Sequence, residues 1–169
     1  MPAKDKDIMT PDPVSEKIYT LPGITQKASQ WKKEGKKIVF TNGVFDLLHK
    51  GHIFSLSQAA QQGDILIIGL NSDNSVKRLK GNSRPINDEG ARALLLASLI
   101  MVDAVVIFEE DTPLELIIST LPDVLVKGGD YTVDQIAGAK EVITNGGKVV
   151  INPILDGFST TAIINAISK

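Results

Sequence analysis

Thr41-Asn42-Gly43-Val44-Phe45-Asp46-Leu47-Leu48-His49-Lys50-Gly51-His52 is the stretch around which this chain is organised. It follows the β-branched run 37–41, which predicts a strand, and it leads into a segment, 52–62, with apolar residues at helical spacing. His49 and His52 are the two histidines of the chain, and their spacing of three places both on one face of a helical turn. The unpaired N–H groups at a helix N-terminus bind anions. The stretch therefore predicts a phosphate-handling site.

The segments around this stretch predict an α/β fold. The apolar run 64–70 is typical of a strand buried on both faces, and with 37–41 and the intervening helix it forms a right-handed βαβ unit. We expect a Rossmann-like, doubly wound, five-stranded parallel sheet with helices on both faces. The other predicted strands are 104–108, 123–126 and 148–151, and the other predicted helices are 25–37, 73–79, 88–101, 113–121, 139–144 and a C-terminal helix.

Length and composition predict one folded domain. The 169 residues suit a single core, and we expect that domain to span residues 23–169. Residues 1–22 contain four prolines among charged residues and few large apolar side chains. We therefore expect a flexible N-terminal arm there.

Charge and cysteine content exclude several classes of function. The formal net charge of -2 gives no general attraction for nucleic acid, so we expect no nucleic-acid partner. The absence of cysteine excludes disulfides, a thiolate nucleophile and a cysteine zinc site. No apolar run approaches the roughly 20 residues of a membrane span, and the charged start does not indicate a signal peptide. These features favour a cytoplasmic protein with no membrane partner.

Four loops at predicted strand ends carry polar or glycine-rich sequence: 42–52, 71–84, 127–131 and 152–161. In a doubly wound sheet, ligands bind beyond the carboxyl ends of the strands, so these loops mark the expected site. The chain has no GxxxxGK[ST] loop, no GxGxxG after the first strand and no GxSxG elbow. A nucleotide would therefore bind here through a different sequence motif.

Val44-Phe45-Asp46 followed by His49-Lys50-Gly51-His52 resembles the HxGH signature of the nucleotidyltransferase superfamily. That superfamily includes cytidylyltransferases, pantetheine-phosphate adenylyltransferase and archaeal FAD synthase. Two stretches are more specific, Glu-Glu-Asp-Thr-Pro at 109–113 and Val-Lys-Gly-Gly-Asp-Tyr at 126–131. With them, residues 25–169 are similar to the adenylyltransferases of ADP-heptose biosynthesis.

The resemblance implies a reaction. ATP would donate AMP to a sugar 1-phosphate, above all D-glycero-β-D-manno-heptose 1-phosphate. The products would be pyrophosphate and ADP-heptose, which serves lipopolysaccharide core or surface glycan synthesis. Mg2+ is expected as the metal ion of the reaction. The resemblance also implies a homodimer. The bifunctional form carries a sugar kinase ahead of this domain, and 169 residues leave no room for one, so a separate heptose kinase is expected.

Three alternatives stay open at this stage. Two are enzymes, a glycerol-phosphate type cytidylyltransferase and an FAD synthase, and the third is a nucleotide-binding regulatory module without turnover. Cytidylyltransferases of that type carry Arg-Thr-x-Gly where this chain has Ile-Leu-Asp-Gly at 154–157. The missing arginine counts against the cytidylyl alternative.

The site residues follow from the resemblance and from the chemistry of phosphate binding. The expected catalytic residues are His49, His52, Lys80 and Arg84. The expected nucleotide-binding residues are Thr41, Asn42, Gly43, Phe45, Gly51, Asn71, Asp73, Arg92, Lys127, Gly128, Ser159, Thr160 and Thr161. Asp46, Asp73 and Gly129 are expected on the acceptor, with the two carboxylates binding either sugar hydroxyls or Mg2+. Structural alternatives exist for several of them: His49 and His52 as capping or packing residues, Lys80 and Arg84 as surface charges, Asp73 and Ser159–Thr161 as helix caps, Gly128–Gly129 as a tight turn, and Arg92 as a packing residue.

Overall fold

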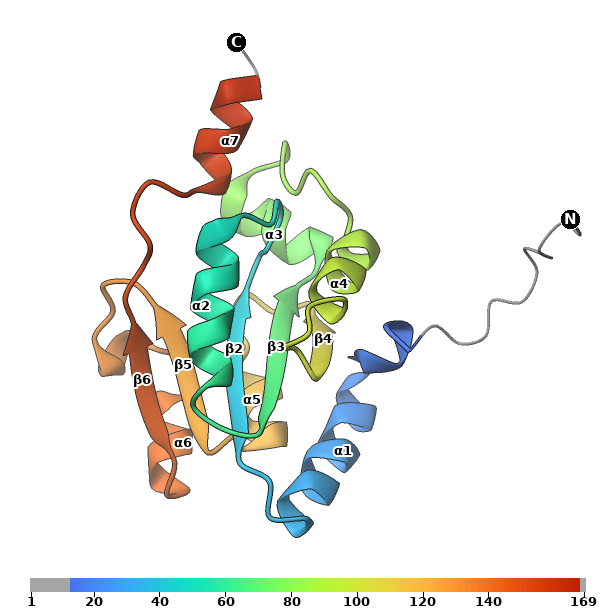
Figure 1. Ribbon diagram of the computed structural model, residues 1–169, viewed down its shortest axis with the longest axis vertical. Coiled ribbons are helices and arrows are strands. Elements are labelled where there is room, and N and C mark those ends of the chain that lie inside the picture. The colour runs from blue at the N-terminus through green and yellow to red at the C-terminus, as the bar shows by residue number, and fades with distance from the viewer. Residues whose placement is uncertain (1–12, 168–169) are drawn as a thin grey trace, which may run out of the picture.

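Six short segments form parallel strands in the computed structural model, which describes residues 13–167. Their order is β1-β4-β3-β2-β5-β6, so the chain runs from β2 toward one edge and then crosses to the other side of β2 (Figure 1). This reversal between β2 and β5 is the switch point at which doubly wound sheets bind ligands. The strands are β1 Ile18–Tyr19, β2 Ile38–Gly43, β3 Ile65–Asn71, β4 Ala104–Phe108, β5 Val124–Gly128 and β6 Lys148–Asn152.

The register of β2 opens the sheet at this switch point. Every residue of β2 pairs with β3, from Ile38 opposite Ile65 to Gly43 opposite Leu70. In contrast, only Val39 and Phe40 pair with β5. The carboxyl end of β2 therefore keeps one neighbouring strand and parts from the other, which leaves space for a ligand between β2 and β5.

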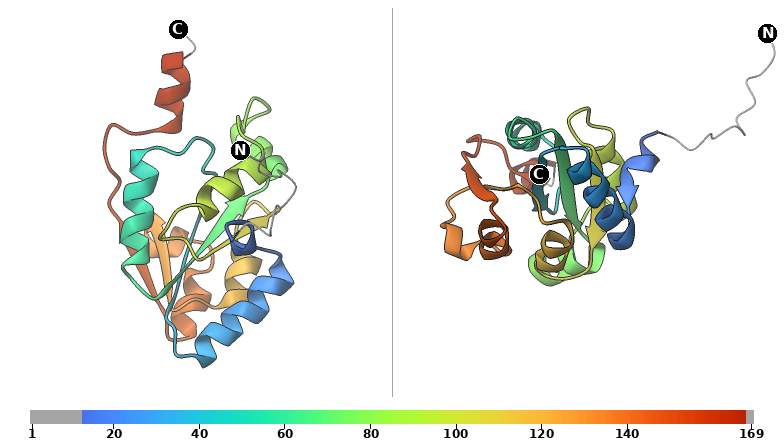
Figure 2. Two further views of the ribbon diagram at one scale, coloured as in Figure 1. Left: turned by 45° about the vertical axis from the view of Figure 1, so that its right-hand side comes forward. Right: turned by 90° about the horizontal axis from the view of Figure 1, so that it is seen from below.

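Helices cover both faces of the sheet, as the sequence predicts (Figures 1 and 2). One core cluster joins α1, α5 and α6 to one face, and a second joins α2 and α4 to the other. The helices are α1 Leu21–Lys33, α2 Lys50–Ala60, α3 Asp73–Lys80, α4 Glu89–Ala97, α5 Leu114–Thr120, α6 Ala139–Thr144 and α7 Thr160–Ile167, with 3₁₀ turns at Ser15–Lys17 and Val133–Gln135. None of the helices in the described part of the chain is long and apolar enough to span a membrane.

Side chains of the central strands alternate between the two cores. Ile38 and Phe40 of β2 are fully buried under α1 and α5, whereas Val39 between them packs toward α2. Alternation of this kind follows from the period of two along a strand. It fixes the register of β2, because a slip by one residue would exchange its two buried sets.

The expected strand count of five is wrong by one, because Ile18–Tyr19 forms β1. This short strand pairs in parallel with Val105 and Val106 of β4 at the sheet edge, and Lys17 Nζ donates to the Val102 carbonyl at 2.8 Å. The run of prolines suggested a flexible arm over 1–22, of which residues 1–12 lie outside the described residues.

The first helix begins at Leu21, four residues before its expected start at 25. Thr20 Oγ1 accepts a hydrogen bond from the Gly23 N–H, and Pro22 lies in the first turn. Proline is tolerated there because the N–H that it lacks has no helical partner anyway. A proline that suggested a flexible segment therefore starts a helix instead.

Candidate functional site

The switch point carries a cavity of about 400 Å³, which we call the histidine cavity. The loop after β2, the N-termini of α2 and α7 and the loop after α3 surround it. It brings together eleven of the expected site residues from segments far apart in sequence. Its lining consists of Val44, Phe45, Asp46, His49, Gly51, His52, Ser55, Lys80, Arg84, Gly128, Ile154, Phe158, Ser159, Thr160 and Thr161.

A second cavity of about 240 Å³ lies beside it at the ends of β2 and β5, and we call it the strand-end cavity. The two cavities share part of their walls, including Phe45 and His52. They are therefore neighbouring parts of one site. The strand-end cavity is lined by Thr41, Asn42, Gly43, Val44, Phe45, His52, Ser55, Leu56, Lys127, Gly128 and Tyr131.

The two histidine rings stack on each other at the start of α2. Their centroids are 3.9 Å apart and their planes differ by 23°. His49 is the N-cap of α2, and its Nδ1 accepts the backbone N–H of Gly51 at 3.1 Å. Since Nδ1 acts as an acceptor, the proton of neutral His49 resides on Nε2, where it can be donated to a ligand.

His52 is held in the neutral form. Burial, and secondly the neighbouring His49, lower its pKa to about 4, although the backbone of Leu47 acts in the opposite direction. Burial also lowers the pKa of His49. Neutral rings can stack closely without repulsion, and His49 keeps its Nε2–H for a phosphate oxygen. His52 Nδ1 is buried without a hydrogen-bond partner in the described part of the chain, so a polar group of the site is open to a ligand.

A side chain at position 51 would be crowded by the residues around the start of α2. A Cβ at this position would lie 3.0 Å from the His49 ring and 3.2 Å from the Cβ of Phe158. Either neighbour would have to move to accept a side chain. Gly51 thus allows the histidine pair and the segment before α7 to meet over the helix start.

Phe45 adopts a left-handed backbone conformation, with φ at +46°. Such a conformation is rare for a bulky residue and is found where the surrounding structure imposes it. The ring lies under His52, with centroids 5.2 Å apart, and fills the space that a Cβ on Gly43 would need. Phe45 therefore supports the histidine pair from the strand side.

Arg84 forms an ion pair with Asp46 at the edge of the histidine cavity. Its Nε donates to Asp46 Oδ2 at 2.6 Å, and the two side chains are 15% and 1% exposed. The other carboxylate oxygen, Oδ1, accepts the backbone N–H groups of Ile86 and Asn87. Both oxygens of the Asp46 carboxylate therefore accept hydrogen bonds from the loop that carries Arg84.

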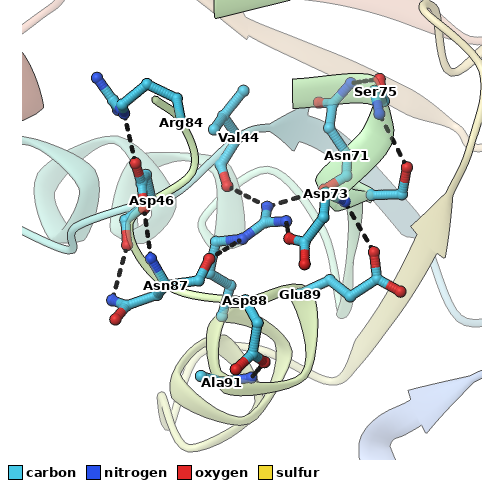
Figure 3. A network of polar contacts seen from close by, with 12 residues as sticks. Val44, Asp46, Asn71, Asp73, Ser75, Arg84, Asn87, Asp88, Glu89 and Ala91 are labelled. Carbon is cyan, nitrogen blue, oxygen red and sulfur yellow. Dashed lines mark hydrogen bonds and ion pairs between the residues drawn. The ribbon is translucent and has the colours of Figure 1, made fainter. Parts of the chain in front are cut away.

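Arg92 lies in the interior, away from both cavities. Its side chain is fully buried and donates to the carbonyls of Asn87, Val44 and Asn71 and to the carboxylate of Asp73. Figure 3 labels these four acceptor residues. A guanidinium with these partners has no exposed donor for a nucleotide. Four backbone and side-chain oxygens from three segments converge on Arg92. Arg92 therefore packs in the interior, and the expectation that it binds the nucleotide is not supported.

Asn71 and Asp73 lie in the same network and line neither cavity. Asn71 Nδ2 donates to Ser75 Oγ at 3.0 Å, and Asp73 receives Arg92 at 2.7 Å. The Asp73 backbone N–H donates to Glu89 Oε2 at the start of α4. Both residues join β3 and α3 to α4 and so hold up the wall of the site (Figure 3).

The remaining expected residues divide between the cavities. Lys127 Nζ donates to Asn42 Oδ1 at 3.4 Å in the strand-end cavity and lies 5.4 Å from the centroid of Tyr131, and burial lowers its pKa. Gly129, in contrast, donates its N–H to Asn152 and lines neither cavity.

Lys80 and the start of α7 border the histidine cavity. Lys80 is exposed at the end of α3. Ser159 Oγ caps α7 by accepting the Ala162 N–H at 3.0 Å, and Thr160 Oγ1 donates to the Leu47 carbonyl at 3.4 Å. Ser159 therefore fills its structural role as a cap while it also borders the site.

Six lining residues are not among the expected site residues: Val44, Ser55, Leu56, Tyr131, Ile154 and Phe158. Ser55 follows His52 by three positions, so helical spacing from the histidines would have identified it. Tyr131 lies in one of the strand-end loops. Phe158 has no such signal, because it reaches the site only where the loop before α7 folds over α2, with the Lys50 ammonium 5.5 Å from its ring centroid.

The chain is similar in sequence to known proteins. The bifunctional protein HldE of Rhodospirillum rubrum is 55% identical over 148 residues, which cover 88% of this chain and 30% of that protein. HldE of Koribacter versatilis is also 55% identical, over 153 residues that cover 90% of this chain and 32% of the relative. The chain thus spans about a third of the length of these relatives.

Two solved structures have the same fold as this chain. The lipopolysaccharide core biosynthesis protein of Thermoplasma volcanium matches with a TM-score of 0.59 at 32% identity, over 72% of this chain and 98% of that one. Pantoate-beta-alanine ligase of Francisella tularensis shares only the fold, with a TM-score of 0.58 at 17% identity, over 89% of this chain and 76% of that one. The cytidylyltransferase-like family matches residues 40–166. The chain belongs to the cytidylyltransferase-like family.

Proposed function

We propose that this chain transfers AMP from ATP to a sugar 1-phosphate, D-glycero-β-D-manno-heptose 1-phosphate, and yields ADP-heptose and pyrophosphate. The observation that carries the proposal is the stacked pair of His49 and His52 at the start of α2, in one cavity with Lys80 and Arg84. Two stacked imidazoles and two cations around a helix start suit a polyphosphate.

The sugar assignment has separate support. The stretches 109–113 and 126–131 resemble adenylyltransferases of ADP-heptose biosynthesis, and the relatives at 55% identity are HldE proteins. A solved relative at 32% identity is described as a lipopolysaccharide core biosynthesis protein. These features favour a sugar-nucleotide product for lipopolysaccharide or another surface glycan over a glycerol-phosphate or flavin product.

In the reaction, an oxygen of the sugar 1-phosphate attacks the α-phosphorus of ATP in line. A new phosphorus–oxygen bond forms while the bond to the bridging oxygen breaks, and pyrophosphate leaves with that electron pair. The step needs positioned reactants and compensation of negative charge rather than a covalent intermediate. His49 and His52 would donate to phosphate oxygens, with Arg84 and Lys80 providing permanent positive charge.

Mg2+ would enter with the nucleotide. Among residues 13–167 there is no group of three or more His, Asp or Glu side chains placed to hold a metal ion. Mg2+ commonly binds through substrate phosphates and water with few protein ligands, so its place in the site would be on the triphosphate. There it would neutralise phosphate charge.

The acceptor carries its phosphate on the anomeric oxygen and must be formed by an earlier reaction. We propose that a sugar kinase supplies this phosphate, on the same polypeptide or on another. We propose further that the chain acts as a homodimer in the cytoplasm, where ATP is supplied. Gel filtration with light scattering would test the dimer.

Pyrophosphate release with a panel of substrates tests the function. We expect turnover with ATP and heptose 1-phosphate, and much slower turnover with CTP, glycerol 3-phosphate or FMN. Equal rates with CTP and ATP would overturn the adenylyl assignment. ATP binding without turnover on any acceptor would indicate the regulatory module instead.

A further inference from the structure

Asp46 borders the histidine cavity but is only 1% exposed. Its carboxylate accepts three hydrogen bonds, from Arg84 Nε at 2.6 Å, the Ile86 N–H at 2.8 Å and the Asn87 N–H at 3.0 Å. All three donors belong to one loop. The carboxylate is therefore committed to the protein and poorly placed to bind a sugar hydroxyl or a cation.

Arg84 is bound in the complementary way. The ion pair uses its Nε, and neither Nη group donates a hydrogen bond to any of residues 13–167. Its side chain is 15% exposed and lines the histidine cavity. One edge of the guanidinium is thus fixed while the remaining donors stay available to an anion, which is how an arginine binds a phosphate with defined geometry.

The loop that carries Arg84 is anchored a second time through Asn87. The Asn87 side chain donates to the Asp46 carbonyl at 3.0 Å, and the Asn87 carbonyl accepts Arg92 Nε at 3.0 Å. Arg92 also donates to the Val44 carbonyl, in the same loop as Asp46. Arg84 therefore has a rigid relation to the loop that leads into the histidine pair.

We propose that Asp46 is a positioning residue, which fixes Arg84 so that its free guanidinium donors face the phosphates beside His49 and His52. This inference rests on the proposed adenylyl transfer. It gives Asp46 an indirect role through Arg84 in place of contact with the acceptor or Mg2+. Arg84 holds the phosphate and Asp46 holds Arg84.

A double-mutant cycle with Asp46→Asn and Arg84→Ala tests the proposal. Asparagine keeps an oxygen for the loop N–H groups but removes the charge that holds Arg84. We expect each single variant to lose roughly 10- to 100-fold in kcat with a smaller change in the KM for sugar phosphate, and the double variant to lie within about 3-fold of Arg84→Ala, because residues that act as a unit are not additive. Additive losses, or a loss confined to the KM of the sugar phosphate, would overturn it.

Arg84→Lys keeps the proposal testable if Asp46→Asn does not fold. A lysine has one ammonium, which Asp46 would occupy, so we expect it to lose about as much as Arg84→Ala. Wild-type turnover of Arg84→Lys would overturn the proposal. The matched control is the exposed pair Arg78–Asp111, with Arg78 Nε 2.8 Å from Asp111 Oδ1, whose Arg78→Ala and Asp111→Asn variants should keep full activity. A loss of similar size in these controls would also count against it.

Calorimetric titration with pyrophosphate separates this proposal from the proposed function. We expect Asp46→Asn and Arg84→Ala to weaken pyrophosphate binding together and without additivity, whether or not the wild-type chain turns over any sugar phosphate. Non-additive losses of pyrophosphate affinity in a chain without turnover would contradict the proposed reaction and support the positioning role of Asp46. Normal turnover of the wild-type chain with additive losses of pyrophosphate affinity in the two variants would support the reaction and contradict the positioning role of Asp46.

Discussion

His49 and His52 stack at a centroid distance of 3.9 Å while His49 also caps the helix that carries both of them. The cap takes up His49 Nδ1 and the Gly51 N–H, so the pair is oriented before any ligand arrives. Orientation in advance lowers the reorganisation needed when charge develops on a phosphate.

The stability of the fold should depend on the protonation of His52. Its pKa of about 4 lies below the ordinary value of 6.5, so between these values the unfolded chain binds a proton that the folded chain does not. The free energy of unfolding should therefore fall as the pH decreases from about 6.5 to about 4. Because solvent screens this partly exposed ring, its contribution should stay well below the roughly 3 kcal/mol of a fully buried group. Urea denaturation at several pH values, compared with His52→Gln, measures it. Parallel curves for the two proteins would contradict the neutral state of His52.

His52→Ala should fold normally and lose roughly 100-fold or more in the rate of pyrophosphate release, because one donor to the transferring phosphate is removed. Circular dichroism checks the fold and the coupled assay gives the rate. Ser57→Ala, on α2 but lining neither cavity, is the control and should keep its rate. Wild-type turnover of His52→Ala would remove this histidine from the mechanism.

Gly51→Ala should impair catalysis more than stability. The added Cβ would lie 3.0 Å from the His49 ring and 3.2 Å from Phe158, so the ring stack or the segment before α7 must shift. Since displacements of about 1 Å can cost on the order of 100-fold in rate, we expect a loss of at least 10-fold. Kinetics together with thermal unfolding distinguish the two effects. An unchanged rate would show that the stacking geometry tolerates displacement.

Arg92→Met should destabilise the protein rather than weaken nucleotide binding selectively. The change leaves the Asp73 carboxylate and the carbonyls of Val44, Asn71 and Asn87 without their donor. Because the Asp73 side chain is 28% exposed and can be partly rehydrated, we expect a loss somewhat below the roughly 3–5 kcal/mol of a fully buried ion pair. Urea denaturation measures it, with the exposed Arg78→Met as a control that should change little. A stable Arg92→Met with lost ATP affinity would instead support direct binding.

Local sequence predicted most of the architecture. Apolar runs such as 64–70 form buried strands, and helical spacing after His52 gives α2, because these patterns depend on near neighbours along the chain. The strand Ile18–Tyr19 was missed, since two residues carry no periodicity and only the edge of β4 makes them a strand. The proline-rich context suggested a flexible segment instead.

Sequence order by itself could not separate ligand-facing charges from structural ones. Arg84 and Arg92 are both arginines near the same loop, yet one lines the histidine cavity and the other is fully buried. The difference arises because the carbonyls of Val44, Asn71 and Asn87 meet at one point only after the strands and helices have packed. A buried guanidinium is stable only where such oxygens converge.

The sequence alone determined the α/β class, the histidine pair at a helix start and the glycine between them, because each is set by neighbours within a few residues. The tertiary structure decided that β2 parts from β5 to open the cavities, that Phe158 covers Gly51, and that Asp46 holds Arg84. These relations join segments tens of residues apart, so they depend on how the sheet orders its strands rather than on any local pattern.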